Sequence, residues 1–337
     1  MGRKSVSVTK ATAPVRKKNL KYTATSTAFR LARRWSRDGA TVTVKKLRKL
    51  IDCIKKIGKE QTCISAELSR YLGKRILMNF IEEKGPHTNV NVKKELQQML
   101  LDSSVWGISN ENFVREYYAF IEKVESTLKH KEIKTESALV HALKHEVVLE
   151  QNKSLVLEFG VASGSSIREM ANYVPKQQVI FGFDSFDGLP DFWRTGFEKG
   201  KFGMKGGEPP LFQERNIKII KGLFEDTCDS FFRRHNALNH TIAFIHIDCD
   251  IYSSTKTIFE ALEKYAHKGN LLSTKTVIVF DELLCYNGFE KHEMLAFFEF
   301  LQKNPTFEYE IIGTKHHGCM SVAIRLIRKK LECTDVV

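Results

Sequence analysis

The 337-residue sequence lacks any apolar run approaching the roughly 20 residues that a membrane-spanning helix needs. Its N-terminus also lacks the apolar core of a secretory signal. The seven cysteines are an odd number, and no two of them form a CxxC pair. These absences argue against a disulfide framework and a zinc knuckle. We therefore expect a soluble, intracellular protein with reduced thiols.

Acidic residues are missing from the first 37 residues, which carry 11 lysines and arginines. Residues 1–60 hold 18 basic and three acidic residues, whereas the rest of the chain holds 35 and 37, so the net charge of +13 belongs to the front end. We expect residues 1–41 to be a flexible basic tail containing a short amphipathic helix around 28–35. A mitochondrial presequence, an arm that contacts RNA or DNA, and a solvated tail all remain open, as do mitochondrial, cytoplasmic and nuclear locations.

Residues 42–150 have the apolar spacing of helices. The pattern predicts helices within 42–84 and at 91–101, 112–128 and 136–150. Gly73 and Gly85 are expected to end two of the first helices, which gives an outline of a helix-turn-helix module. We favour the alternative, a small helical bundle that packs on the main domain.

After residue 153 the sequence alternates between short apolar runs and helical patterns. The runs lie at 154–159, 179–183, 216–220, 241–247 and 276–280. Such runs, separated by helices, are typical of a parallel sheet covered on both faces. The last two runs, 307–313 and 319–327, are joined by a short turn and should form an antiparallel hairpin at the sheet edge. The sequence thus predicts an α/β fold over 151–330, with a Rossmann-like sheet, an N-terminal helical region and a tail at 331–337.

Two motifs follow the first two strands, where ligands of such sheets bind. The segment EFGVASGSS (158–166) contains Gly160 and Gly164, which permit a tight turn and a close ligand approach. It matches neither GxGxxG nor a GK[ST] phosphate loop, so an ordinary strand-to-helix turn is the alternative. Asp184 closes the second strand, where a carboxylate binds a ribose diol in dinucleotide folds; an N-cap is the alternative.

Four carboxylates follow the fourth and fifth strands. Asp248 and Asp250 are two residues apart, so they point the same way while the chain is extended, and Asp281 and Glu282 end the neighbouring strand. Solvated loop caps explain one or two such residues but not four. Clustered carboxylates repel one another unless a cation lies between them, and hard oxygen ligands suit Mg²⁺, Ca²⁺ or Mn²⁺.

These motifs together resemble the macrocin O-methyltransferase (TylF-type) family of S-adenosylmethionine-dependent, metal-dependent enzymes that methylate sugars and antibiotics. The segments are LEFGVASGSSI, GFDSFDGLPDFW, HIDCDIYSST, and FDE with HE ten residues later, and the match spans 155–327. The resemblance implies a class I methyltransferase sheet of seven strands, with S-adenosylmethionine and Mg²⁺ as cofactors. Nothing before residue 153 resembles the core of that family.

The resemblance also implies roles for individual residues. Glu158, Gly160 and Gly164 would line the methionine end of the cofactor, and Asp184 would hold its ribose. Ser185, Gly222 and Phe224 would lie near the adenine. Asp248, Asp281 and Glu282 would bind Mg²⁺, Glu282 replacing an aspartate that many relatives have. Asp250 would be the general base, while His246 and His292 are equally open to structural and functional roles.

The implied reaction transfers a methyl group from S-adenosylmethionine to a hydroxyl of a sugar-like or diol-containing small molecule or glycan. The long loop at 186–213 is rich in glycine, proline and aromatic residues, and we expect it to form a lid over the substrate. The alternative from another class is a catalytically idle methyltransferase fold that serves as a structural component of a ribonucleoprotein or nucleic-acid assembly, anchored by residues 1–60.

Overall fold

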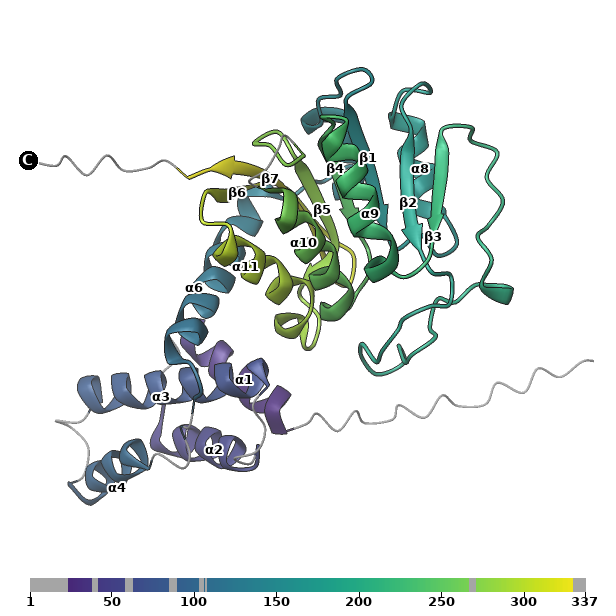
Figure 1. Ribbon diagram of the computed structural model, residues 1–337. Helices are drawn as coiled ribbons and strands as arrows, with labels where there is room; N and C mark the ends of the chain where they lie inside the picture. Colours follow the sequence, from purple (N-terminus) through teal and green to yellow (C-terminus); the bar gives the residue numbers. More distant parts are fainter. Residues whose placement is uncertain are drawn as a thin grey trace, which may run out of the picture.

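The computed structural model describes residues 24–37, 42–57, 63–84, 90–102, 106, 108–266 and 271–329. A seven-stranded sheet carries helices on both faces, and a group of N-terminal helices lies beside it (Figure 1). Residues 1–23 and 330–337, which include most of the predicted basic tail and all of the predicted C-terminal tail, lie outside the described residues. Within the described part, no helix is both long enough and apolar enough to cross a lipid bilayer.

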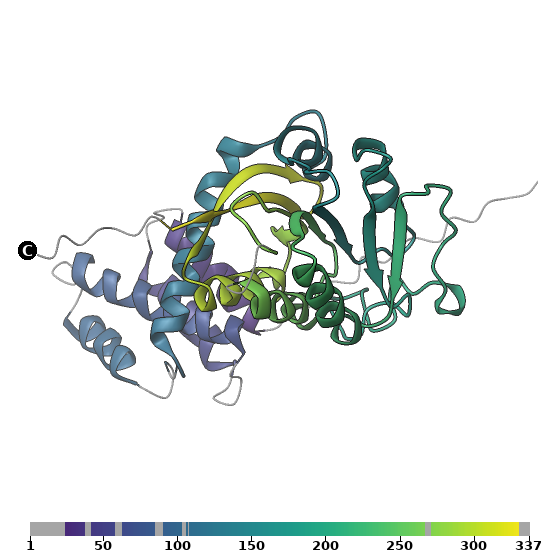
Figure 2. The ribbon, with the colours of Figure 1, turned by 45° about the horizontal axis from the view of Figure 1, so that its top comes forward.

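The sheet has the strand order β3-β2-β1-β4-β5-β7-β6. The first five strands are parallel, and β7 is antiparallel to both β5 and β6. Figure 2 shows the long β6–β7 hairpin curving along one edge. The predicted α/β fold, with five parallel strands and a C-terminal antiparallel hairpin, is confirmed. The strands are β1 (Ser154–Phe159), β2 (Ile180–Asp184), β3 (Ile217–Lys221), β4 (Thr241–Ile247), β5 (Val277–Leu284), β6 (Phe307–His316) and β7 (Met320–Arg328).

Helices cover both faces of the sheet, which explains why its strands are apolar without alternation. On one face α8 packs with Val156, Val277 and Val279. On the other face α9, α10 and α11 pack with Leu155, Leu157 and other residues of opposite strand parity. These helices are α8 (Ser165–Tyr173), α9 (Phe224–Ala237), α10 (Tyr252–Ala266) and α11 (Glu293–Lys303), with the short turns η4 (Lys205–Gly207) and η5 (Phe289–Lys291) between them.

The segment predicted as a helix over 136–150 is shorter and irregular. It forms α7 (Ala138–His141) and a π-helical turn, η3 (Ala142–Glu146). Ser137 caps α7, since its side chain accepts a hydrogen bond of 3.1 Å from the amide of Val140. The π turn closes when the amide of Val147 donates to the carbonyl of Ala142 at 3.0 Å. The chain then leaves the helix because Val147 adopts an extended conformation.

The N-terminal helices pack together rather than remaining separate. The helix predicted around 28–35 exists as α1, and its Ala28 and Ala32 are fully buried where α1 meets α2 and α3. Residues 24–37 therefore belong to the packed region, although the predicted boundary at residue 41 places them in a free tail. The domain boundaries otherwise stay predictions. The helices are α1 (Ala24–Arg37), α2 (Val44–Lys55), α3 (Ile64–Lys84), α4 (Val90–Leu101), α6 (Glu111–Leu128) and η2 (Lys129–Lys131).

Gly73 does not end a helix, so that prediction is wrong. The helix α3 continues through it to Lys84, and the helix-turn-helix outline fails with it. A side chain at position 73 would collide with Ile54 of α2 and with Trp106. The glycine therefore provides close helix packing, which costs helix propensity but permits the contact. Gly85 lies outside the described residues.

The helical region contacts the main domain close to the end of β5. Tyr117 of α6 donates a hydrogen bond of 2.6 Å to the carbonyl of Glu290, and Ser65 of α3 donates one of 2.6 Å to its carboxylate. The guanidinium of Arg33 lies 4.8 Å from the ring centre of Phe289. The helical region thus supports η5, which directly precedes His292 and Glu293.

Candidate functional site

A cavity of about 480 Å³ opens at the carboxyl ends of β1, β2, β4 and β5. The strand order reverses between β1 and β4, which is where sheets of this type bind ligands. Two of the predicted site residues, Glu158 and Gly164, are not in its walls. The predicted residues that do line it are Gly160, Asp184, Ser185, Gly222, Phe224, Asp248, Asp250, Asp281 and Glu282.

The loop between β1 and α8 forms one wall of the cavity. Gly160 has φ of +93°, and any side chain there would strike the carbonyl of Asp248. Gly164 is also left-handed, with φ of +79°, and begins α8. Ala162 adopts φ of +43° between them, a strained value for a residue with a side chain. The result is a tight turn that brings the serines at the start of α8, Ser165 and Ser166, to the cavity wall.

The carboxylate of Asp184 already holds three backbone amides. Its Oδ2 accepts hydrogen bonds of 2.8 Å from both Val161 and Ala162, and its Oδ1 accepts one of 2.7 Å from Phe186. The alternative of an N-cap is not realised, since no helix begins directly after Asp184. The bonds instead join the turn after β2 to the glycine loop after β1. A carboxylate has about four acceptor positions, so roughly one remains for a ligand hydroxyl.

The turn after β3 forms another part of the cavity wall. The amide of Gly222 donates a hydrogen bond of 3.0 Å to the carbonyl of Asp184. Phe224 begins α9, and its ring meets Phe159 edge-on with 5.5 Å between centroids. Ser185 and Phe224 thus give this side of the cavity one polar and one aromatic surface.

The four predicted carboxylates all line this cavity. Asp248 and Asp250 follow β4, whereas Asp281 and Glu282 lie inside β5, which runs four residues further than predicted. Burial, followed by the charge of Asp281, raises the pKa of Asp248 to about 8. Burial, followed by the charges of Asp248 and Glu282, raises the pKa of Asp250 to about 9. Ionising all four carboxylates at neutral pH is therefore unfavourable unless a cation compensates their charge.

Asp250 is held in an unusual backbone conformation. Its φ is +66°, and its amide donates a hydrogen bond of 3.2 Å to Oε1 of Glu293. Left-handed values at non-glycine residues are strained and concentrate at functional sites. The strain turns the chain from β4 into α10 and keeps Asp250 at the cavity.

Glu293 is a fifth carboxylate of this cluster that the sequence reasoning did not single out. It is 1% exposed, and burial raises its pKa well above the usual value, followed by the charges of Asp250 and Asp248. Its Oε2 and that of Glu282 are buried and have no hydrogen-bond partner among the described residues. The HE pair at 292–293 carries the signal, because it places an acidic residue next to the histidine of a matched motif.

Arg194 forms an ion pair with one carboxylate of the cluster, that of Glu282. Its Nη2 lies 3.5 Å from Oε1 of Glu282. Its guanidinium lies 3.8 Å from the ring centre of Trp193 and 5.1 Å from that of Tyr286. Arg194 belongs to the loop at 186–213, whose Gly188, Leu189, Pro190 and Phe202 line the cavity. The loop thus forms part of the cavity wall, and its role as a lid stays a prediction.

The carboxylate cluster fits a divalent cation by its donor chemistry. It offers hard oxygen ligands whose ionisation a cation would favour, and buried oxygens on Glu282 and Glu293 without a hydrogen-bond partner in the described part of the chain. Ligand oxygens from Asp248, Asp281 and Glu282, one from each residue, do not all lie within 4.8 Å of one another. Among the described residues, only Glu136, His141 and His145 have ligand atoms that close together. Cation binding by the predicted ligands would therefore draw their side chains together.

The two histidines of the matched motifs differ in their surroundings. His246 faces Glu158 across β1 and β4, with 2.9 Å between Nδ1 and Oε1, below the cavity. His292 is buried, and neither ring nitrogen has a hydrogen-bond partner among the described residues. Burial, followed by the charges of Lys291 and Arg194, lowers the pKa of His292 to about 3, so the ring is neutral.

No protein-family model matches the chain, and none of the curated proteins does either. Among solved structures it is similar to fibrillarin from Aeropyrum pernix with natively bound S-adenosyl-L-methionine, at 12% identity over 56% of this chain and 72% of that one, with a TM-score of 0.32. It is similar to a putative rRNA-methylase from Clostridium thermocellum, at 17% identity over 59% and 100%, with a TM-score of 0.33. A third is an O-methyltransferase from Bacillus cereus in complex with SAH, at 14% identity over 63% and 90%, with a TM-score of 0.35. Similarity this low leaves the narrower family resemblance untested, and function has to be argued from the site.

Proposed function

We propose that this protein is an S-adenosylmethionine-dependent, Mg²⁺-dependent O-methyltransferase. The acceptor would be a hydroxyl of a sugar-like or diol-containing small molecule or glycan. The observation that carries the proposal is that one cavity is lined both by the glycine loop and by the four predicted carboxylates.

The cavity residues of the glycine loop and of the turns after β2 and β3 suit the methyl donor. Gly160 lets the backbone turn sharply beside Asp248, and Asp184 retains roughly one free acceptor position for a ribose hydroxyl. Phe224 offers an apolar surface for a flat ring. The volume of about 480 Å³ falls within the range of roughly 300–1,000 Å³ that is usual for small-molecule sites.

The carboxylates that line the cavity suit a cation and a hydroxyl acceptor. Asp248, Asp281 and Glu282 would hold Mg²⁺, and Glu293 would help to position Asp250 by accepting the hydrogen bond of its amide. When bound, the cation would lower the pKa of an acceptor hydroxyl, and S-adenosylmethionine would supply an already activated methyl group. The charge of the bound cation would keep Asp250 ionised, and its carboxylate would accept the hydroxyl proton. The loop at 186–213 would exclude water and orient the acceptor, so positioning would supply much of the remaining catalysis.

Isothermal titration and a methyl-transfer assay on the full-length protein test this proposal. We expect S-adenosylmethionine to bind, and methylation of diol acceptors to require added Mg²⁺ and to stop with chelator. Asp248→Asn should lower the rate by about 100-fold or more. Asp226→Asn, an exposed aspartate of α9, is the matched control and should leave it unchanged. Absence of cofactor binding, or activity indifferent to chelator and to Asp248→Asn, would refute the proposal.

A second role, contact with nucleic acid through residues 1–60, is favoured by the surface of α2. Lys45, Lys49, Lys55 and Lys56 are exposed there, while the buried side of the helix packs on its neighbours. A row of exposed lysines binds phosphates through counterion release, which makes binding steeply salt-dependent. This role is compatible with the enzyme or with an idle fold in a ribonucleoprotein.

Charge reversal tests this second role better than truncation, because α1 and α2 contribute buried residues to the helical region. Lys45→Glu combined with Lys49→Glu should weaken binding to single-stranded or duplex RNA and reduce its salt dependence. Lys199→Glu, on an exposed part of the loop, is the control. If full-length protein binds no nucleic acid at low salt, the role is excluded.

A further inference from the structure

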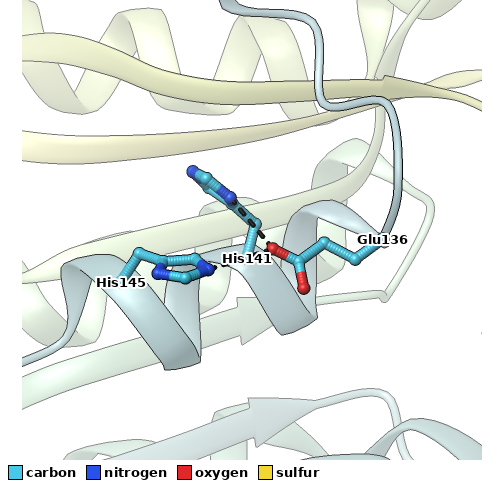
Figure 3. Close-up of side chains that lie close together, drawn as sticks. All are labelled: Glu136, His141 and His145. Carbon is cyan, nitrogen blue, oxygen red and sulfur yellow. Dashed lines mark hydrogen bonds and ion pairs between the residues drawn. The ribbon is translucent and has the colours of Figure 1, made fainter.

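Three potential metal ligands converge at α7, on a surface distinct from the cavity. Oε1 of Glu136 lies 3.2 Å from Nδ1 of His141 and 3.3 Å from Nε2 of His145. Figure 3 shows both imidazole rings approaching the same carboxylate from the helix. All three ligand atoms lie within 4.8 Å of one another, and no other set of histidine, cysteine or acidic residues in the described ranges does so.

The separations match the coordination geometry of zinc. With bonds of about 2.0–2.1 Å, the edge of a tetrahedron measures about 3.3 Å. Two distances between potential ligand atoms, 3.2 Å and 3.3 Å, agree with that edge. Two imidazole nitrogens and a carboxylate oxygen are also a common ligand set for zinc, with water in the fourth position.

The local backbone brings the two histidines together. His141 ends α7, and His145 lies in the π-helical turn η3 that follows. A π turn is wider than an α turn, so residues four apart lie more nearly above one another, and the ring centroids are 5.0 Å apart. Such single π turns are frequent at functional sites. Gly313 of β6 leaves room for the ring of His141, which a side chain there would crowd.

Neighbouring side chains are arranged as supports for such a site. Nζ of Lys144 lies 2.7 Å from Oε2 of Glu136, which leaves Oε1 facing the histidines. Nε2 of His141 lies 3.9 Å from Oε1 of Glu146, which also pairs with Arg325 of β7. A carboxylate near the second ring nitrogen is the usual support for a metal-binding histidine.

We propose that Glu136, His141 and His145 form a binding site for Zn²⁺ or a similar late first-row divalent cation. Nδ1 of His141, Nε2 of His145 and Oε1 of Glu136 are the ligands, and the ring protons reside on the other nitrogens. The cation ties the segment before α7 to the helix. That segment also joins the sheet, since the amide of Ile133 donates to the carbonyl of Thr314 at 2.8 Å. Metal binding therefore stabilises the passage from the helical region into the sheet.

Metal titration of chelator-treated full-length protein tests the site. Zn²⁺ binding is followed by calorimetry, and Co²⁺ binding by its visible absorption, which distinguishes imidazole and carboxylate ligands from thiolates. We expect one equivalent to bind through these residues, and His145→Ala and Glu136→Gln each to weaken it by about tenfold or more. Added Zn²⁺ should raise the melting temperature of the wild type and not of these variants.

Two controls separate this site from others. His130→Ala removes an exposed histidine of the adjacent η2 turn and should leave binding unchanged. Asp248→Asn weakens the carboxylate cluster in the cavity and should also leave it unchanged. The proposal is overturned if His145→Ala and Glu136→Gln, shown to be folded by circular dichroism, bind Zn²⁺ like the wild type. It is equally overturned if Asp248→Asn alone abolishes binding.

Discussion

Glu158 and His246 form a buried ion pair directly beneath the cavity. They are partners in register on β1 and β4, and they are 0% and 1% exposed. Burial by itself lowers the pKa of His246, but the hydrogen bond and charge of Glu158 outweigh it and raise the pKa to about 9. Since Glu158 is absent from the cavity wall, this pairing indicates a structural contribution at the end of β1.

Glu158→Gln should destabilise the protein by about 1–3 kcal/mol, because it leaves a buried histidine without its charged partner. Thermal or denaturant unfolding measures the loss. Glu169→Gln, an exposed glutamate of α8, serves as the control and should have little effect. If Glu158→Gln leaves stability intact but abolishes S-adenosylmethionine binding, Glu158 binds the cofactor as the family resemblance implies.

Asp248→Asn should stabilise the chelator-treated protein by ~1 kcal/mol while it abolishes catalysis, because it relieves repulsion within the carboxylate cluster. Melting temperatures with and without Mg²⁺ measure both effects. Added Mg²⁺ should raise the melting temperature of the wild type and of Asp226→Asn, but not of Asp248→Asn. An equal response in all three proteins would show that Mg²⁺ does not bind through Asp248.

Arg194→Gln should loosen the loop at 186–213, because the guanidinium contacts Glu282 and the rings of Trp193 and Tyr286. Cation–π contacts of a desolvated arginine contribute about 1–2 kcal/mol, so the loop should become more sensitive to limited proteolysis. Trp193 is 1% exposed, and its fluorescence should shift to longer wavelength as it meets water. Lys199→Gln is the control in the same loop, and identical proteolysis of the two variants would contradict the prediction.

Stability should fall as the pH drops from about 6.5 to about 4, in part through His235. Burial, followed by the charges of His240 and Arg234, lowers the pKa of His235 to about 4. Its Nδ1 lies 2.7 Å from that of His240, so protonating both rings is unfavourable. The unfolded chain therefore binds more protons than the folded one in this pH range. His235→Gln should flatten the decline of melting temperature with acid, and a decline as steep as that of the wild type would refute this.

The strands and the hairpin were predictable because their signals are local. The runs at 154–159 and 241–247 coincide with β1 and β4, since buried parallel strands need continuous apolar residues. The hairpin followed from the absence of a helix between the last two runs. The predicted carboxylates meet at one cavity because the ends of neighbouring parallel strands lie at one edge of a sheet.

Features that depend on packing between distant segments were missed or misplaced. Gly73 reads as a helix terminator, yet its neighbours Ile54 and Trp106 make it a contact point inside α3. Glu293 and Arg194 reach the carboxylate cluster only because α11 and the loop at 186–213 fold over β4 and β5. No periodicity within either segment specifies that approach.

The sequence by itself determined where the strands lie along the chain, the glycine turn after β1 and the acidic residues that follow the apolar runs of β4 and β5. Each depends on residues that are adjacent in the chain. Only the tertiary structure decided that Asp184 is largely occupied by backbone amides, that Glu158 pairs with His246, and that Glu136 meets two histidines. Those contacts depend on the separation of atoms from different segments, and the packing of the whole domain sets that separation.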